Sequence, residues 1–249
     1  MRLDARLLAA VALALPVLAH ADPDEYVNVP AVEYGEREID MKYGTRYFDD
    51  PGARESAGSI GLGWGARQWW FTEAYLKYHK DPGDRTRYDE FEWENKFQLT
   101  EPNKYFADLG FLIETEIPRA REEGRYILKA GPLVQFDTGP LRWNTNVFFE
   151  RAFRSRSEEP AVTQLQYQAQ VTYHLRGPNL DVGAQAFGDL GKWNDWLPGD
   201  EQSHRIGPAV FGKVKLAGRQ AIVWNAAWLF GASKAAADNA VRLQMEYEF

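Results

Sequence analysis

Cysteine is absent from this sequence, methionine is scarce, and long apolar runs are confined to its start. None of the 249 residues is Cys and three are Met, so the chain forms neither a disulfide framework nor a zinc–thiolate site. After residue 21 no apolar run approaches the about 18 residues that a membrane-spanning helix needs. Positive charge is also in deficit. The formal net charge of −7 argues against a nucleic-acid partner, because nucleic-acid binders present basic surfaces.

The apolar run at the start predicts a secretory signal peptide over residues 1–21. Arg2 and Arg6 supply a short basic start, residues 7–18 are almost entirely apolar, and Ala19-His20-Ala21 fits a small-residue cleavage site. An apolar run of about 12 residues is short for a membrane anchor. The sequence therefore predicts a chain that is exported across an inner membrane.

The rest of the chain repeats one pattern, in which apolar and polar residues alternate. In residues 241–249 every odd position is apolar or aromatic, ending at Phe249, and in residues 163–175 Leu165, Tyr167 and Val171 alternate with glutamines. Alternation with a period of two predicts strands, each with one face toward lipid and one toward water. Twelve such segments are predicted: 36–48, 58–66, 69–80, 88–99, 105–117, 125–136, 141–153, 163–175, 180–188, 204–216, 221–231 and 241–249.

Twelve strands of this length predict an all-β fold, an antiparallel up-and-down transmembrane β-barrel over residues 35–249. Residues 22–34 carry no periodicity and are predicted to be a periplasmic lead-in. In a closed barrel the last strand must pair with the first, which leaves no free edge. Gly131-Pro132 and Gly207-Pro208 fall inside strands and predict bulges. Asn95 falls on the lipid face, where an amide side chain needs a polar partner.

The connections between the predicted strands alternate in length, those after odd-numbered strands being longer. This is the arrangement of a membrane barrel with short periplasmic turns and long outer loops, and a soluble β-sandwich gives no reason for it. The expected surroundings are therefore outer-membrane lipid and lipopolysaccharide. The longest loop, residues 189–202, holds Trp193 and Trp196. These rings either fold into the mouth, rest on lipopolysaccharide, or pack the loop itself.

The polar face of the predicted strands carries charges of opposite sign on opposite walls. An acidic set lies on the third to fifth strands, and a basic set lies on the tenth, six strands away and so across the barrel. These residues are predicted to line a pore and to orient a small charged solute, as rings of charged side chains do in other channels. The alternative is that the charges bridge one another and close the lumen into a polar plug. The predicted pore-lining residues are Glu73, Glu90, Glu92, Glu94, Glu114, Glu116, Arg205, Lys213 and Lys215.

The sequence offers little that could carry out catalysis or hold a metal or cofactor. A nucleophilic site needs a nucleophile with a base in reach, and the adjacent pair Ser203-His204 at a loop edge is the only candidate. The His-x-Ser arrangement of the twelve-stranded outer-membrane phospholipase has no match here. His79 and His204 are the only histidines predicted near the outer rim, and neither has clear partners for a metal. The expectation is no enzyme activity, no cofactor and no metal.

Four stretches carry a resemblance to a known family. They are residues 128–136 (LKAGPLVQF), 144–151 (NTNVFFER), 204–212 (HRIGPAVFG) and 243–249 (LQMEYEF). These resemble proteobacterial outer-membrane proteins related to the phenol-degradation MetA-pathway-like barrels, and the likeness covers roughly residues 88–249. The resemblance implies a barrel, sometimes linked to uptake of hydrophobic or aromatic compounds, with no catalytic residues. The closing strand is similar to those whose terminal Phe, here Phe249, is read by the outer-membrane assembly machinery.

The reading that follows is a barrel in the outer membrane of a Gram-negative bacterium. The predicted function is a narrow channel that passes small polar or aromatic solutes. The alternative is a closed structural or surface-binding barrel that acts through its outer loops, without transport.

Overall fold

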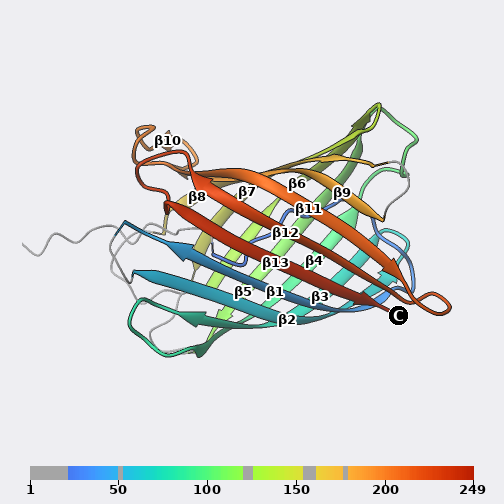
Figure 1. Cartoon of the computed structure of the whole chain (residues 1–249), viewed down its shortest axis with the longest axis horizontal. Helices are drawn as coiled ribbons and strands as arrows, with labels where there is room; N and C mark the ends of the chain where they lie inside the picture. Colours follow the sequence, from blue (N-terminus) through green and yellow to red (C-terminus); the bar gives the residue numbers. More distant parts are fainter. Residues whose placement is uncertain (1–21, 50–52, 120–125, 154–160, 176–178) are drawn as a thin grey trace, which may run out of the picture.

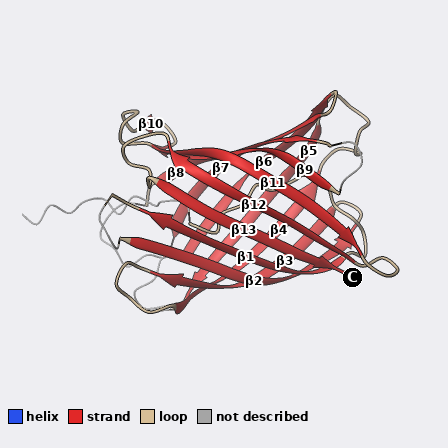
Figure 2. Ribbon diagram, viewed as in Figure 1, coloured by secondary structure: helices blue, strands red, loops and turns tan. Residues whose placement is uncertain are grey.

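The computed structural model describes residues 22–49, 53–119, 126–153, 161–175 and 179–249, and their regular structure is entirely β-strand (Figure 2). The predicted signal peptide, residues 1–21, lies outside the described residues. Among the described residues there is no helix with the length and apolarity needed to cross a membrane.

Twelve long strands form one antiparallel barrel, tilted to its axis (Figure 1). A further strand of two residues, β10 (Asp195–Trp196), only extends the hairpin that follows β9. The twelve are β1 (Arg37–Tyr47), β2 (Arg54–Arg67), β3 (Trp70–Lys80), β4 (Arg87–Gln98), β5 (Asp108–Pro118), β6 (Tyr126–Thr138), β7 (Leu141–Phe153), β8 (Thr163–Tyr173), β9 (Leu180–Lys192), β11 (Ser203–Lys215), β12 (Ala221–Gly231) and β13 (Asn239–Glu248).

The barrel is closed by the pairing of its first and last strands. Each long strand pairs with its neighbours in sequence, β9 pairing with both β8 and β11. β13 then pairs with β1 through Ile39 opposite Tyr247 and Thr45 opposite Val241. No long strand is left with an unpaired edge, which removes the template for edge-to-edge association. The predicted twelve-stranded closed barrel is confirmed.

Three strands differ from the prediction by three or more residues at one end, and the others agree to within two residues at each end. β2 begins at Arg54 rather than at residue 58, because its first residues continue the ladder with the outer end of β1. β5 begins at Asp108 rather than at residue 105. β9 runs on to Lys192 and pairs there with β10, so part of the predicted 189–202 loop is a strand hairpin. Alternation of apolar and polar residues marks only the part of a strand that has lipid on one face and the lumen on the other. Backbone pairing can continue beyond that part, so the pattern does not fix the ends of the strand.

The two faces of the wall are the reverse of those of a soluble protein. Large apolar side chains stand on the outside, with Leu62 66%, Trp64 51% and Trp228 54% exposed. Polar and charged side chains such as Gln168 and Arg242 are buried inside. This is the pattern expected when the outer surface is solvated by lipid.

Asn95 on the lipid face has the partner that the sequence requires. Its Oδ1 accepts a hydrogen bond of 3.0 Å from Trp70 Nε1 on the neighbouring strand. The amide oxygen and the indole N–H therefore satisfy each other, as side chains in the hydrocarbon region must.

The predicted bulges at Gly131-Pro132 and Gly207-Pro208 are wrong. In the β6–β7 ladder both strands skip two residues, so the register across the gap is unchanged, and the same holds for β11–β12. On their other sides these strands pair without interruption. Each proline lacks an N–H donor, so the ladder with the next strand is interrupted at the proline and resumes in the same register. The residue before each proline is a glycine because the next strand approaches too closely for a side chain. A Cβ at Gly131 would collide with the Val147 carbonyl oxygen, and a Cβ at Gly207 with the Trp228 carbonyl oxygen.

The end of the barrel that holds Phe249 carries mostly short connections, and the opposite end carries longer ones. Following the rule for outer-membrane barrels, the Phe249 end is periplasmic.

Of the two tryptophans in the long outer loop, Trp193 lies edge-on to Phe149, with ring centroids 6.3 Å apart. Phe149 is 43% exposed on the outer surface. Trp193 therefore leans over the lipid-facing side and does not fold into the mouth.

Candidate functional site: the barrel lumen

The predicted acidic residues of β3–β5 do gather on one inner wall. Glu92 lies opposite Glu116, and Glu94 opposite both Glu114 and Glu73, in adjoining ladders. Like charges in directly opposed positions repel, and burial strengthens the repulsion. This acidic wall must therefore be compensated. Its members are Glu73, Glu90, Glu92, Glu94, Glu114 and Glu116, all buried except the half-buried Glu90.

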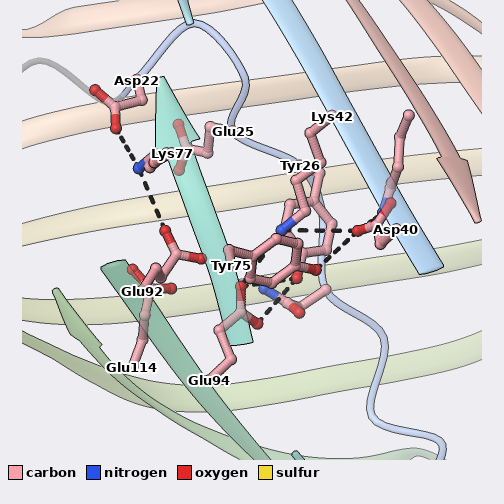
Figure 3. Close-up of polar contacts among 12 residues, drawn as sticks. Asp22, Glu25, Tyr26, Asp40, Lys42, Tyr75, Lys77, Glu92, Glu94 and Glu114 are labelled. Atoms are coloured by element: carbon pink, nitrogen blue, oxygen red, sulfur yellow. Dashed lines mark hydrogen bonds and ion pairs between the residues drawn. The ribbon is translucent and has the colours of Figure 1, made fainter. Parts of the chain in front are cut away.

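Three lysines contact the acidic wall, and two of them, Lys42 and Lys77, are labelled in Figure 3. Lys77 Nζ lies 3.2 Å from a carboxylate oxygen of Glu90 and 3.3 Å from one of Glu92. Lys42 Nζ lies 3.5 Å from Glu94. On the neighbouring strand β6, Lys129 Nζ lies 2.8 Å from Glu114, its cross-strand partner. Lys77 and Lys129 lie on strands next to those of their partners, whereas Lys42 on β1 reaches Glu94 on β4 across the curved inner wall.

The predicted basic wall is only partly in the lumen. Arg205 is buried inside, with its guanidinium 3.5 Å from Glu25. Lys213 and Lys215 are exposed at the periplasmic end, where Lys213 Nζ lies 2.8 Å from Glu248. They face inward, as alternation predicts, but at a depth where the lumen opens to water. Inside the lumen, β13 contributes a basic side chain that the prediction omitted, Arg242. Its guanidinium donates a hydrogen bond of 2.5 Å to Gln185 Oε1.

The chain before β1 lies inside the barrel, and the expectation of a periplasmic lead-in for residues 22–34 does not describe its position. At the outer end of the lumen, Asp22 is ion-paired with Lys77. At the periplasmic end, the Val32 N–H donates to Gln98 Oε1 over 2.8 Å. Residues 22–36, called here the N-terminal segment, therefore run the length of the lumen before β1 begins (Figure 1).

The middle of the N-terminal segment has no regular secondary structure, and successive residues contact different walls. The Tyr26 hydroxyl lies 2.9 Å and 3.0 Å from the two carboxylate oxygens of Glu94. Lys42 Nζ stands 3.5 Å from the centroid of the same Tyr26 ring (Figure 3). This is a cation–π contact in a site shielded from water, where such contacts are stronger.

The next two residues bind the other side of the lumen. Val27 packs into an apolar cluster on the inner face of β9 and β11–β13, which includes Phe187 and Leu229. The Asn28 carbonyl accepts a hydrogen bond of 3.0 Å from Asn146 Nδ2, and its N–H donates to Gln168 Oε1 over 3.3 Å. Three consecutive residues therefore fix the segment against three parts of the wall.

A glycine on β1 makes room for the start of the N-terminal segment. Gly44 faces the lumen, and a Cβ at this position would collide with the carbonyl oxygen of Pro23. The backbone of the segment therefore approaches the wall as closely as a neighbouring strand would. A side chain at residue 44 would push the segment away.

Two hollows lie beside the N-terminal segment, and they share no lining residue. The larger one, the outer cavity, has a volume of about 490 Å³ and is lined by the segment, the acidic wall and the outer ends of β1–β3. The smaller one, the periplasmic hollow, has a volume of about 260 Å³ and contains Lys213, Lys215 and Arg219. Val27 of the segment and the inward side chains of Gln185 and Arg242 line neither hollow and are buried in the lumen.

The candidate catalytic pair does not have the geometry of a nucleophile and its base. His204 Nδ1 lies 3.0 Å from the Tyr167 hydroxyl, and its Nε2 lies 2.8 Å from Gln202 Oε1. Both ring nitrogens therefore face groups other than Ser203. His79 lies on a different wall and contacts Glu55 and Asp81, each at 3.2 Å. The two histidines do not form a shared metal site.

Among solved structures, the fold is similar to that of the NanC porin, with a TM-score of 0.57 and 11% sequence identity over 85% of this chain and 98% of that chain. Omp33 of Acinetobacter baumannii aligns with a TM-score of 0.40 and 10% identity over 88% and 99% of the two chains. OmpT of Vibrio cholerae aligns with a TM-score of 0.32 and 6% identity over 86% and 100%. No protein-family model and no curated protein sequence matches the chain.

The closed barrel, its apolar exterior and its likeness to the NanC porin place this chain among the β-barrel proteins of the bacterial outer membrane, with a porin-like architecture. At these sequence identities the likeness concerns the fold. The resemblance to the phenol-degradation MetA-pathway-like barrels is matched by no family model and stays a prediction.

Proposed function

We propose that the protein is a narrow outer-membrane channel for small polar solutes, with a preference for cations, and that the N-terminal segment closes its resting lumen. The observation that carries the proposal is the set of polar and charged side chains that line both hollows and much of the inner wall of the barrel. A barrel built only as an anchor has no need for buried carboxylates on its inner wall, since burying charge costs free energy.

The preference for cations follows from the charges around the outer cavity. Its lining includes twelve carboxylates and four basic side chains, and a water-filled constriction with excess carboxylates favours cations. The acidic residues of the proposed route are the predicted set, Glu73, Glu90, Glu92, Glu94, Glu114 and Glu116. Arg205 and, at the periplasmic mouth, Lys213 and Lys215 would repel cations locally and set the direction of the field. Passage of aromatic solutes is supported only by the MetA-pathway-like resemblance.

A second function is favoured by one observation, the contacts that fix Tyr26, Val27 and Asn28 against three parts of the wall. In this alternative the N-terminal segment is a permanent core, and the barrel acts as a closed structural or surface-binding protein. Its outer hairpin, residues 189–202, with Trp193 and Trp196 exposed, is then the surface for a partner or for lipopolysaccharide.

Single-channel recordings in planar bilayers distinguish the two functions. They compare the intact barrel with a release variant, in which Tyr26, Val27 and Asn28 are replaced by serine. A channel that rests closed gives small or rare openings in the intact protein and stable conductance in the release variant. Silence of both folded proteins at every salt concentration favours the closed barrel and rules out the channel.

Selectivity is tested by adding Glu92→Gln and Glu94→Gln to the conducting form. The reversal potential in a KCl gradient is expected to move toward that of a less cation-selective pore, because two carboxylates of the acidic wall lose their charge. The matched control is Glu101→Gln, which removes an exposed carboxylate outside the lumen. An unchanged reversal potential in the double variant would show that Glu92 and Glu94 do not contribute to selectivity.

Phe249 is proposed as the contact for the outer-membrane assembly machinery. Its N–H donates to the Arg37 carbonyl over 2.8 Å, while its ring is 46% exposed at the periplasmic end. A Phe249→Ala variant is expected to fold normally in detergent but to accumulate more slowly in outer membranes. Equal accumulation of the variant and the parent protein in membranes contradicts this role.

A further inference from the structure

The carboxylates of the outer cavity form a ready-made set of oxygen ligands. Two groups of three, Glu90 with Glu92 and Glu116, and Glu92 with Glu94 and Glu114, hold their carboxylate oxygens within 4.8 Å of one another. Two ligands on opposite sides of a Ca²⁺ ion lie about 4.6–5.2 Å apart, because Ca²⁺–oxygen distances are about 2.3–2.6 Å. Glu92 belongs to both groups and is the shared member.

An acidic cluster on a wall is not by itself a binding site, and a separate observation points to a ligand. Asp24 belongs to the N-terminal segment, lines the same cavity, and is only 3% exposed. Among the residues that the structure describes, neither of its carboxylate oxygens has a hydrogen-bond partner. A buried carboxylate without a donor is costly, so its position in the cavity calls for a cation.

The lysines near the cluster do not supply enough positive charge. Lys77, Lys42 and Lys129 are each in contact with carboxylates of the acidic wall. Against these three charges stand seven carboxylates of the same cavity, and one divalent cation would offset half of the excess. Those seven are Asp22, Asp24, Glu90, Glu92, Glu94, Glu114 and Glu116.

We propose that the outer cavity binds a divalent cation of the Ca²⁺ class between the acidic wall, through Glu92 and its neighbours, and Asp24 of the N-terminal segment. Hard cations prefer carboxylate oxygens, and Ca²⁺ accepts the irregular geometry of a site built from several strands. The ion joins the segment to the wall, so its binding also favours the closed lumen. The site exists whether or not the barrel conducts.

The test is isothermal titration of CaCl₂ into the full-length folded barrel, free of lipopolysaccharide and in a non-ionic detergent. Saturable binding of one ion is expected for the parent protein. Asp24→Asn and Glu92→Gln are each expected to weaken it by at least about tenfold, since each removes a charged ligand. Neither substitution changes side-chain volume appreciably, and heat-modifiable migration on a gel confirms that each variant is folded.

The matched control is Glu33→Gln, because Glu33 lies on the same segment but is exposed and paired with Arg219 at the periplasmic end. Its affinity for Ca²⁺ should equal that of the parent. Absence of saturable binding to the parent protein overturns the proposal, and so does an affinity that Asp24→Asn leaves unchanged. Because titration measures no transport, a silent channel with intact Ca²⁺ binding refutes only the proposed function.

Discussion

Release of the N-terminal segment is the perturbation for which the structure gives the clearest expected size. The release variant replaces Tyr26, Val27 and Asn28 by serine. It removes the Tyr26 hydrogen bonds to Glu94, the packing of Val27 in the apolar cluster and side-chain packing of Asn28. None of these residues lies in a strand, so the wall of the barrel is left intact.

The three substitutions remove interactions that contribute several kcal/mol to docking of the segment. A hydrogen bond to a buried carboxylate contributes about 1.5–3 kcal/mol, and burial of a Val side chain about 1.5 kcal/mol or more. Together the two losses come to about 4 kcal/mol, which shifts the ratio of docked to undocked segment by about a thousandfold at 1.4 kcal/mol per factor of ten. The ordering entropy of the segment opposes docking throughout.

The expected gain in conductance follows from the dimensions of the barrel. Twelve strands about 4.8 Å apart and tilted by about 40° enclose a cylinder about 24 Å across between backbones. Long inward side chains reduce this to about 10 Å, which is the thickness of one extended segment with its side chains. With the segment docked, the open width is about that of one water molecule, about 3 Å. Widening it to about 10 Å increases the cross-section, and with it the conductance, by about tenfold.

The assay is single-channel recording in planar bilayers, with a control variant that changes the same segment without undocking it. Val29→Ser combined with Tyr34→Ser alters two exposed side chains of the segment. The reasoning predicts high, stable conductance for the release variant and parent-like behaviour for the control. If both variants conduct equally, or if the release variant conducts no better than the parent, the N-terminal segment does not close the lumen.

Two further predictions concern the wall. Gly207→Val should destabilise the barrel by about 2 kcal/mol or more, because the new Cβ collides with the Trp228 carbonyl. Gly199→Val, in open space, should not, and urea unfolding in detergent measures both; equal midpoints would contradict the close approach. Asn95→Ala should lower the free energy of unfolding by about 0.5–1.5 kcal/mol, because Trp70 Nε1 loses its acceptor. An unchanged midpoint would mean that lipid or water replaces this hydrogen bond.

Much of the barrel could be predicted from alternation alone. The period of two gives the face of each residue, which is why Glu92, Glu94 and Glu114 were expected in the lumen and are found there. The same period carries no information on depth along the axis. For that reason Lys213 and Lys215 were assigned to a wall inside the lumen, although they stand at its periplasmic mouth.

The position of the N-terminal segment could not be predicted, and the reason is physical. Residues 22–36 have no periodicity because their neighbours differ from one residue to the next. Tyr26 meets β4 and β1, Val27 meets β9 and β11–β13, and Asn28 meets β7 and β8. These walls are far apart in sequence and come together only when the barrel closes. The local signals are glycines at inward positions, Gly44, Gly65 and Gly110, which mark a close approach of backbone but do not identify the residues that approach.

The central claim is that the N-terminal segment occupies the lumen, and a disulfide tests it directly. A Cβ at Gly110 would lie 2.9 Å from Pro30 Cβ, and disulfides join Cβ atoms about 3.8 Å apart, so a shift of about 1 Å allows the bond. Because the chain has no cysteine, Pro30→Cys with Gly110→Cys gives the only pair. Its control is Pro30→Cys with Leu109→Cys, since Leu109 faces the outside of the same wall.

The measurement is the number of free thiols in each folded variant after mild oxidation and removal of the oxidant. The account predicts none for the Pro30/Gly110 pair and two for the Pro30/Leu109 pair, because the wall separates the second pair. Two free thiols in both folded variants would place the segment outside the barrel and contradict the account.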